Sequence, residues 1–416
     1  MLRVHKIRLD PTPAQATYFA KACGVARFAY NWALAEWQKQ YAAAQLDPAL
    51  PKPNEGALRR QLNAIKREQF PWMLEVTKCA PQEAIRALGR AYGNWFASLS
   101  GKRRGPKVRA PRFKKKFQHD RFKFDEKFAV EDSRIRIPNL GWVRMREPLR
   151  FSGTLKGATV SRTAHAWFVA ILIETDDLPA RSESQAAVGV DFGLTQLATL
   201  SDGSAPVPGI KALGVVLARL RRLSRAHSRK QKGSANRKKS AQRLARLHWH
   251  IACVRADALH KLSDRLTRDY AWIAIEDLNV KGMLANRRLA RHIADAGFGE
   301  LRRQLTYKAA QRGVQLVVVD RWFASSKTCS HCEAINDALT LSDRTWTCTG
   351  CGTAHERDEN AAKNILKESL RMFEKRTPGA GDSACGAEGT GGLATVKPAA
   401  AKQEVKHNQV TWPLYA

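Results

Sequence analysis

Four cysteines between positions 329 and 351 limit what this chain can fold into more than any other feature of its sequence. They form two pairs, each separated by two residues, with fifteen residues between the pairs. Two thiolates on one tight turn span an edge of a tetrahedron, and a short hairpin brings up the second pair, so this spacing predicts a zinc ribbon. A closed set of four thiolates makes the Zn²⁺ structural, and the nearby His331 and His355 would be bystanders. A chance pattern or a redox dithiol is the alternative. The expected zinc ligands are Cys329, Cys332, Cys348 and Cys351.

The chain also carries a large excess of positive charge. It has 71 Lys and Arg against 38 Asp and Glu among 416 residues, which gives a net charge of +33 at pH 7. Such a charge repels itself unless a polyanion neutralises it, so nucleic acid is the first candidate partner and an anionic membrane surface the second. No run of about 18 apolar residues is present, and residues 1–6 lack the apolar run of a signal peptide. We therefore expect a cytoplasmic protein.

The first half of the chain reads as a β-rich module with helices inserted into it. Residues 13–44 and 55–96 have a helical pattern, and we expect the second stretch to be interrupted near Pro71 and Pro81. Short alternating runs before these helices and across 119–180 are typical of strands.

The second half alternates short apolar runs with long helical stretches. Predicted strands end at Asp191, Leu200, Glu276 and Val319, with helical segments between them. From residue 373 the sequence is rich in Gly, Ala, Thr and Lys without periodicity, which predicts a disordered tail.

Two segments concentrate the positive charge. Nine basic residues fall between Lys102 and Lys116, and twelve Lys or Arg with no Asp or Glu fall between Arg219 and Arg246. Unbalanced runs favour phosphate as the counter-charge, although an ordinary solvated surface is the alternative for many of these side chains. The candidate backbone contacts are Lys102, Arg103, Arg104, Arg112, Lys114, Arg229, Lys230 and Lys238.

Three carboxylates stand at the edges of predicted elements. Asp191 and Glu276 each end a strand, and Asp358 begins a helix just after the cysteines. Taken singly, each could be a turn former or a helix cap. Together, carboxylates from three segments can hold two Mg²⁺ ions, which clamp the attacking water and the leaving oxygen of a phosphodiester. The set indicates a nuclease.

These motifs also carry a family resemblance. Gly189–Gly193, Ile275–Leu278, the four cysteines and His355–Ala362 occur in an order that resembles the transposon-encoded TnpB family, relatives of the type V CRISPR nucleases. Further signatures are Asn31 in its Phe-Ala-Tyr-Asn context, Pro111–Lys115, Asn279–Met283 and Ser325–Cys329. The resemblance covers roughly residues 1–372. Glu356, where Asp is common, and Glu333, where Gly is frequent, depart from it.

The resemblance implies a multidomain α/β plus α+β protein. Its parts would be a β-barrel-like wedge module (1–12 and 99–183), an inserted helical recognition module (13–98), an RNase H-like (RuvC-type) nuclease domain (184–322 and 353–372), a zinc ribbon (323–352) and the tail (373–416).

The resemblance further implies cleavage of double-stranded DNA, directed by a guide RNA made from the transposon end and next to a short adjacent motif. Asp191, Glu276 and Asp358 become the catalytic, Mg²⁺-binding triad, with Asp191 bridging both ions. Lys78 and Gln82 resemble positions that face the motif duplex, although they could be ordinary helix-surface residues. We expect a monomeric ribonucleoprotein that acts at the nucleoid.

Other classes of function remain open. His248 and His250 superficially match the histidine pair of single-strand transposases, but that chemistry needs them on a strand and they fall in a helical stretch. The triad could also serve strand transfer, which would leave joined rather than free ends. A catalytically silent RNA-guided DNA-binding protein, or a zinc-ribbon binder without catalysis, would leave the three acids unexplained.

Overall fold

The fold is described from a computed structural model covering residues 1–176, 184–340 and 342–375. Two compact units divide the chain, Met1–Leu370 and Arg371–Ala416. Helix α9 (Arg357–Glu374) runs past residue 373, so the predicted tail begins too early by a few residues. The rest of that predicted tail, 376–416, lies outside the described residues.

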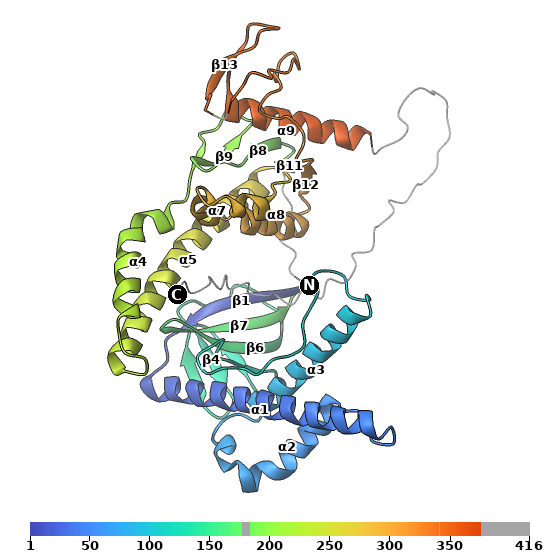
Figure 1. Ribbon diagram of the computed structural model, residues 1–416, viewed down its shortest axis with the longest axis vertical. Coiled ribbons are helices and arrows are strands. Elements are labelled where there is room, and N and C mark those ends of the chain that lie inside the picture. Colours follow the sequence, from blue (N-terminus) through green and yellow to red (C-terminus); the bar gives the residue numbers. More distant parts are fainter. Residues whose placement is uncertain (177–183, 341, 376–416) are drawn as a thin grey trace. The chain divides into compact units, whose positions relative to one another are not determined.

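Antiparallel strands before and after the inserted helices pair with one another, as Figure 1 shows for β1, β7 and β6. The four-stranded sheet has the order β1-β7-β6-β2, and a three-stranded sheet has the order β3-β4-β5. A single bridge between Leu9 and Met145 connects the two sheets. The strands are β1 (Leu2–Leu9), β2 (Arg121–Phe124), β3 (Ala129–Glu131), β4 (Arg134–Ile137), β5 (Gly141–Arg144), β6 (Thr154–Thr163) and β7 (Ala166–Glu174).

Helices between β1 and β2 begin where the sequence supplies caps. Thr12 and Gln15 form a capping box at the start of α1, and Asn54 accepts a hydrogen bond from the Ala57 amide at the start of α2. The helical elements are α1 (Pro13–Leu46), α2 (Glu55–Gln69), the 3₁₀ turn η1 (Pro71–Glu75) and α3 (Cys79–Leu99).

The helix interruptions predicted near Pro71 and Pro81 are both present. Phe70 and Pro71 lie at the junction of α2 and η1, and residues 76–78 separate η1 from α3. Pro81 itself lies in the first turn of α3, where the amide it lacks would have had no intrahelical partner. Buried side chains from α1, α3 and both sheets, such as Phe19, Ile85 and Ile171, form one continuous core.

A mixed five-stranded sheet forms the frame of the second half. Its order is β10-β9-β8-β11-β12, in which β8, β11 and β12 are parallel and the other two pairings are antiparallel. The strands are β8 (Ala187–Asp191), β9 (Gln196–Leu200), β10 (Val207–Pro208), β11 (Trp272–Glu276) and β12 (Gln315–Val319).

The basic stretch of 219–246 is divided between two helices. Residues 229–234 interrupt it, and the Ser234 hydroxyl accepts a hydrogen bond from the Arg237 amide to begin the second helix. Apolar residues of the second helix that are spaced by three or four positions are mostly buried, for example Leu247, Ile251 and Leu266, whereas Val254 is exposed. The helices are α4 (Ala212–Ser228), α5 (Ala235–Asp269), α6 (Val280–Ala285), α7 (Ala290–Ala296) and α8 (Phe298–Arg312).

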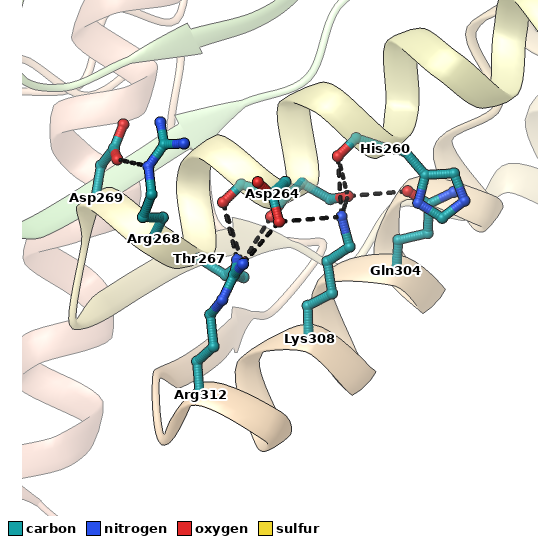
Figure 2. Close-up of polar contacts among 9 residues, drawn as sticks. His260, Asp264, Thr267, Arg268, Asp269, Gln304, Lys308 and Arg312 are labelled. Carbon is teal, nitrogen blue, oxygen red and sulfur yellow. Dashed lines mark hydrogen bonds and ion pairs between the residues drawn. The ribbon is translucent and has the colours of Figure 1, made fainter. Parts of the chain in front are cut away.

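Polar contacts join α5 to α8 (Figure 2). The Arg312 guanidinium donates to the Asp264 carboxylate at 2.7 Å, and the Lys308 ammonium donates to the His260 carbonyl at 2.9 Å. The hydroxyl of the buried Ser263 donates to Gln304 at 2.9 Å. These contacts satisfy the polar groups where the two helices pack, so α8 is held in a defined register on α5.

Short antiparallel strands β13 (Thr345–Thr347) and β14 (Ala354–Glu356) bring the second cysteine pair back toward the first. A small separate core of Cys329, Leu339, Trp346 and Cys348 lies beneath them. Throughout the described ranges, we find no helix long and apolar enough to cross a membrane.

Candidate active site and metal centre

The parallel register of β8 and β11 places Asp191 beside Glu276. Val190 pairs with Ile275, and each acid is the next residue of its strand. Neighbouring strands lie about 4.8 Å apart, and ligands of open α/β sheets bind at the carboxyl ends of strands. Two of the three predicted carboxylates therefore stand at the same edge of the sheet.

Helix α9 brings the third carboxylate to this edge. A Cβ added to Gly189 would lie only 2.0 Å from the Ala362 carbonyl oxygen, so β8 and α9 touch backbone to backbone and only glycine fits. The Trp272 indole also donates to the Ser369 hydroxyl at 3.0 Å, which ties α9 to β11. Asp358 lies in the first turn of α9, and its charge acts on Asp191.

The surroundings of Asp191 and Glu276 disfavour their charged forms. Burial, and after it the charges of Glu276 and Asp358, together raise the pKa of Asp191 to about 7. Burial also raises the pKa of Glu276, while the Ser325 hydroxyl, which donates to it at 2.6 Å, opposes the shift. Carboxyl groups held at such a cost are stabilised by a bound cation, and hard oxygen ligands suit Mg²⁺.

Two arginines partly balance Asp358. Arg344 donates to its Oδ2 at 3.3 Å, and Arg357 donates to its Oδ1 at 3.2 Å. Within the described ranges, the three carboxylates do not form a set whose ligand atoms lie as close together as those of the cysteines. The three carboxylates therefore lie in one region, but their oxygen atoms are farther apart than the ligand atoms of a compact metal site.

The four predicted cysteines do form such a set. Their Sγ atoms all lie within 4.8 Å of one another, with Cys329 3.7 Å from Cys351 and Cys332 3.6 Å from Cys348. Sulfur atoms on a tetrahedral zinc with bonds of about 2.3 Å would be about 3.8 Å apart. The sequence prediction of a four-cysteine cluster that could bind a structural metal such as zinc is confirmed.

His355 is more than a bystander to the cysteines. Its Nε2 lies 3.0 Å from the Cys329 Sγ, and its ring packs against Trp346 at 4.8 Å between centroids. The four sulfurs complete the set without it, so His355 has the position of a hydrogen-bond partner to one thiolate. No comparable contact is recorded for His331 among the described residues.

Buried asparagines of α9 join the cysteine segment to the carboxylate cluster. Asn360 accepts from the Ser330 amide and donates to the Thr328 carbonyl, and Asn364 donates to the Ser325 carbonyl. Ser325 is also the partner of Glu276. The sequence reasoning gave no role to Asn364, Arg344 or the Ser325 hydroxyl. The signal available in the sequence is the spacing of four residues between Asn360 and Asn364, which places both on the same face of a helix.

The predicted phosphate contacts differ in accessibility. Most are exposed, but the Lys114 ammonium is largely buried 3.6 Å from the centre of the Tyr30 ring, and this burial lowers its pKa to about 8. Lys114 is thus poorly placed for a phosphate. The exposed candidates are Lys102, Arg104, Arg112, Arg229 and Lys238, and Arg103 and Lys230 are half-buried.

Lys78 and Gln82 line one recess of about 260 Å³ between α2 and α3. Polar side chains of α2, among them Asn63 and Lys66, line the same recess. Lys78 also forms an ion pair with Glu126 at 3.2 Å. By contrast, His248 and His250 lie on α5, a helix, and not on the strand that a transposase histidine pair requires.

Comparisons with known proteins agree with these motifs. Family models match residues 1–45 (a helix-turn-helix domain), 170–287 (a probable transposase) and 298–365 (a Cas12f1-like TNB domain). A protein of Streptomyces pristinaespiralis named "Putative RNA-guided DNA endonuclease" is 38% identical over 369 residues, which cover 88% of this chain and 89% of that protein. The similarly named InsQ protein of Escherichia coli is 33% identical over 383 residues, which cover 88% of this chain and 92% of that protein. The chain belongs to the TnpB family.

The TnpB family relationship extends along the chain from the first strand to α9. A solved Cas12f1–guide RNA–target DNA complex is similar over 85% of this chain and 83% of that one, with 16% identity and a TM-score of 0.47. The family model for residues 1–45 is described as a helix-turn-helix domain, whereas those residues form β1 and almost all of the 34-residue helix α1. In this TnpB protein the matched segment therefore contains one helix.

Proposed function

We propose that this chain is an RNA-guided DNA endonuclease that hydrolyses target DNA next to a transposon-adjacent motif. The observation that supports it best is the meeting of Asp191, Glu276 and Asp358, from β8, β11 and α9, in one cluster of like charge. The five-stranded sheet, in which β9 alone runs opposite to the other four strands, fits an RNase H-like nuclease domain. Two relatives that align with most of the chain carry names with this activity.

Each side chain of the cluster has a distinct task. The charges of both Glu276 and Asp358 act on Asp191. The Ser325 hydroxyl donates a hydrogen bond to Glu276 and so orients its carboxylate. Two Mg²⁺ ions held by these acids would supply an activated water and stabilise the departing oxygen. The Arg344 guanidinium is 56% exposed, so it can leave Asp358 and bind a phosphate oxygen of the DNA instead. Its planar array of N–H donors matches the geometry of a phosphate.

The zinc ribbon has a positioning role in this scheme. Arg344 directly precedes β13 of the cysteine hairpin, and α9 follows β14 without a break. A bound Zn²⁺ would fix this hairpin, and with it the approach of Arg344 to Asp358. Loss of the metal should therefore impair cleavage without removing any carboxylate.

Recognition is divided between the protein and a guide RNA. Lys78 and Gln82 in the recess between α2 and α3 would read the adjacent motif, because Gln can pair bidentately with adenine in the major groove. The basic segments 102–116 and 219–246 would contact nucleic-acid backbones, which carry charge but no sequence information. Base pairing with the guide would then supply the sequence choice.

Co-purified RNA and the ends of the DNA product test this function. The protein would be purified from cells that carry its transposon end, its bound RNA sequenced, and the complex incubated with a plasmid matching the RNA, with Mg²⁺ or without. We expect one RNA species with a variable 3′ end and Mg²⁺-dependent linear product with free 5′-phosphate and 3′-hydroxyl ends. Random RNA, or cutting that ignores the RNA sequence, would contradict the proposal.

Strand transfer is the second candidate, because one family model that matches residues 170–287 is described as a probable transposase. The same plasmid assay separates the two activities. Joined ends in the presence of a second DNA would favour transposition, and free ends favour hydrolysis.

A further inference from the structure

A surface hollow of about 490 Å³ opens between α1 and η1, outside every site described above. Its walls are mostly aromatic, and its volume lies in the range of about 300–1,000 Å³ that small-molecule sites occupy. It shares no lining residue with the recess that contains Lys78 and Gln82. The lining residues are Gly24, Arg27, Phe28, Asn31, Trp32 and Trp72.

Trp72 is exposed and yet held in place. It is 42% exposed, although tryptophan is highly buried on average. Phe28 packs edge-on against it with ring centroids 5.0 Å apart, and Phe70 packs edge-on against both. This support fixes the indole and leaves part of it open, as a stacking platform requires.

A cationic segment is attached to the wall of the hollow. The Asn31 amide donates to the Lys114 carbonyl at 3.0 Å and accepts from the Lys114 amide at 2.8 Å. The neighbours Arg112, Lys115 and Lys116 are exposed, and so are two aromatic rings between and after them, Phe113 (53%) and Phe117 (73%). Cations interleaved with exposed rings match the charge and the bases of a single strand.

The polar groups of the hollow are already engaged. Asn31 is used by the Lys114 backbone, and Arg27 forms an ion pair with Asp120 at 3.5 Å. A ligand in the hollow would thus be held by ring stacking and by phosphate contacts, with little reading of base edges. That is the chemistry of an unpaired nucleotide bound without strong sequence preference.

We propose that this aromatic cleft stacks an unpaired base of the guide RNA while the Arg112–Lys116 segment holds the adjoining phosphates. The inference rests on the proposed RNA-guided function and names a site for the RNA within it. RNA fits better than DNA because folded RNA presents unpaired bases in loops, bulges and ends. In the target DNA one strand becomes paired with RNA, and the displaced strand is the part that presents unpaired bases, so the crosslinking experiment below distinguishes this strand from the guide RNA.

Binding of a short uridine-rich single-stranded RNA to the full chain tests the cleft. We expect Trp72→Ala to weaken this binding by roughly 5- to 150-fold, and Trp72→Phe to retain most of it. The matched control is Trp142→Ala, because Trp142 of β5 is similarly exposed at 38% but lies outside the cleft. Its affinity should equal that of the wild type. Thermal unfolding of each variant would show that the fold is intact.

Equal affinity of Trp72→Ala and the wild type would overturn the inference, and so would an equal loss in Trp142→Ala. If the wild type binds no RNA at all, the proposed function fails with it. If the wild type carries its RNA and cuts DNA while Trp72→Ala binds RNA unchanged, only the cleft assignment fails.

Photocrosslinking identifies which nucleic acid occupies the cleft. Thiouridine placed along the guide RNA of the assembled complex should crosslink to the peptide that contains Trp72 or to the one that contains Phe28. Thiothymidine in the target DNA should not. Crosslinks to these peptides from the DNA alone would overturn the assignment to RNA.

Discussion

The cysteine set and the carboxylate cluster are neighbours through α9, but they are built in opposite ways. The four sulfurs come from one stretch of 23 residues, Cys329 to Cys351, and lie within 4.8 Å of one another. The carboxylates come from β8, β11 and α9. Ser325 is hydrogen-bonded to Glu276, and Arg344 and Arg357 form ion pairs with Asp358. One set is closed by local turns, and the other depends on the whole sheet.

This difference indicates different tasks. A closed tetrahedron of thiolates has no position for a substrate, so its metal can only support the fold. Carboxylates left apart, with raised pKa values and exchangeable arginine partners, keep room for cations and a phosphodiester. The comparison predicts that damage to the first set appears mainly as lost stability, and damage to the second mainly as lost activity.

Asp191→Asn gives the largest expected effect. The amide cannot replace a bridging carboxylate, so single-turnover cleavage with Mg²⁺ should slow by about 10³-fold or more. RNA binding and zinc content should not change. Asp257→Asn, an exposed acid paired with Lys261 on α5, is the control and should cut normally. A rate for Asp191→Asn within tenfold of wild type would remove Asp191 from the site.

Cys329→Ser tests the opposite side of the comparison. Cys329 is fully buried, and a hydroxyl there would break the thiolate set, so bound zinc should be lost and the free energy of unfolding should fall by about 4 kcal/mol or more. Metal analysis and thermal unfolding measure this. Cys253→Ser, at an exposed lone cysteine of α5, should shift stability by less than about 0.5 kcal/mol. Full zinc content in Cys329→Ser would contradict the predicted ligand set.

Arg344 connects the two sets and should give an intermediate effect. Arg344→Ala removes the guanidinium beside Asp358 and should slow cleavage roughly 100-fold, the lower end of the loss expected for one transition-state donor. Zinc content should stay at the wild-type level because no sulfur is disturbed. Arg344→Lys, which keeps the charge without the planar fork, should recover part of the rate. Equal zinc loss in Arg344→Ala would show a structural role instead.

The pH dependence of stability is a smaller test of the carboxylate cluster. The pKa of Asp191 is raised to about 7 in the folded protein, whereas in the unfolded chain it lies near 3.9. The folded state thus binds more protons between these values, so Asp191 lowers stability as pH rises from about 4 to about 7, with no further change above.

In Mg²⁺-free buffer, Asp191→Asn should therefore be more stable than wild type by up to about 4 kcal/mol at pH 8 and nearly equal to it at pH 4. Chemical unfolding at both pH values measures the difference. Added Mg²⁺ should reduce it, because the cation stabilises only the wild-type cluster. A difference that does not vary with pH would mean that Asp191 is ionised as easily as in the unfolded chain.

The parts of the structure that sequence predicts well are those specified locally. The spacing of the cysteines predicts their meeting because short turns suffice to bring them together. The strands that end in Asp191 and Glu276 are apolar runs whose ends are visible in the sequence. The interruption predicted near Pro81 is also local: it lies at residues 76–78, just before the proline, which is accepted in the first turn of α3.

The parts that sequence did not predict depend on tertiary packing. Nothing near Arg344 in the chain indicates that it will face Asp358, and the Ser325 hydroxyl gains its partner only when β11 and α9 assemble. The break at 229–234 between α4 and α5 differs from these cases, because it has local signals in Gly233, whose φ is 88°, and in the helix cap Ser234. The contact of His355 with the Cys329 sulfur likewise requires the pairing of β13 and β14.

The smallest expected effect concerns the two turns that follow the cysteine pairs, because one turn has Glu and the other Gly at the same backbone position. Glu333 follows the first cysteine pair and Gly352 follows the second, and both have left-handed backbone, with φ of 67° and 72°. A side chain at such a position destabilises the fold by roughly 1 kcal/mol, whereas the exposed ion pair of Glu333 with Lys367 at 3.3 Å stabilises it little.

Glu333→Gly should thus raise the free energy of unfolding by about 0.5–1 kcal/mol, and Gly352→Ala should lower it by a similar amount. Glu333→Gln, which removes the ion pair but keeps the strain, should change stability by less than about 0.5 kcal/mol. Rates of zinc release to a chelator would rank the three variants, and a faster release from Glu333→Gly than from Glu333→Gln would show that the first turn depends on its side chain and not on its backbone.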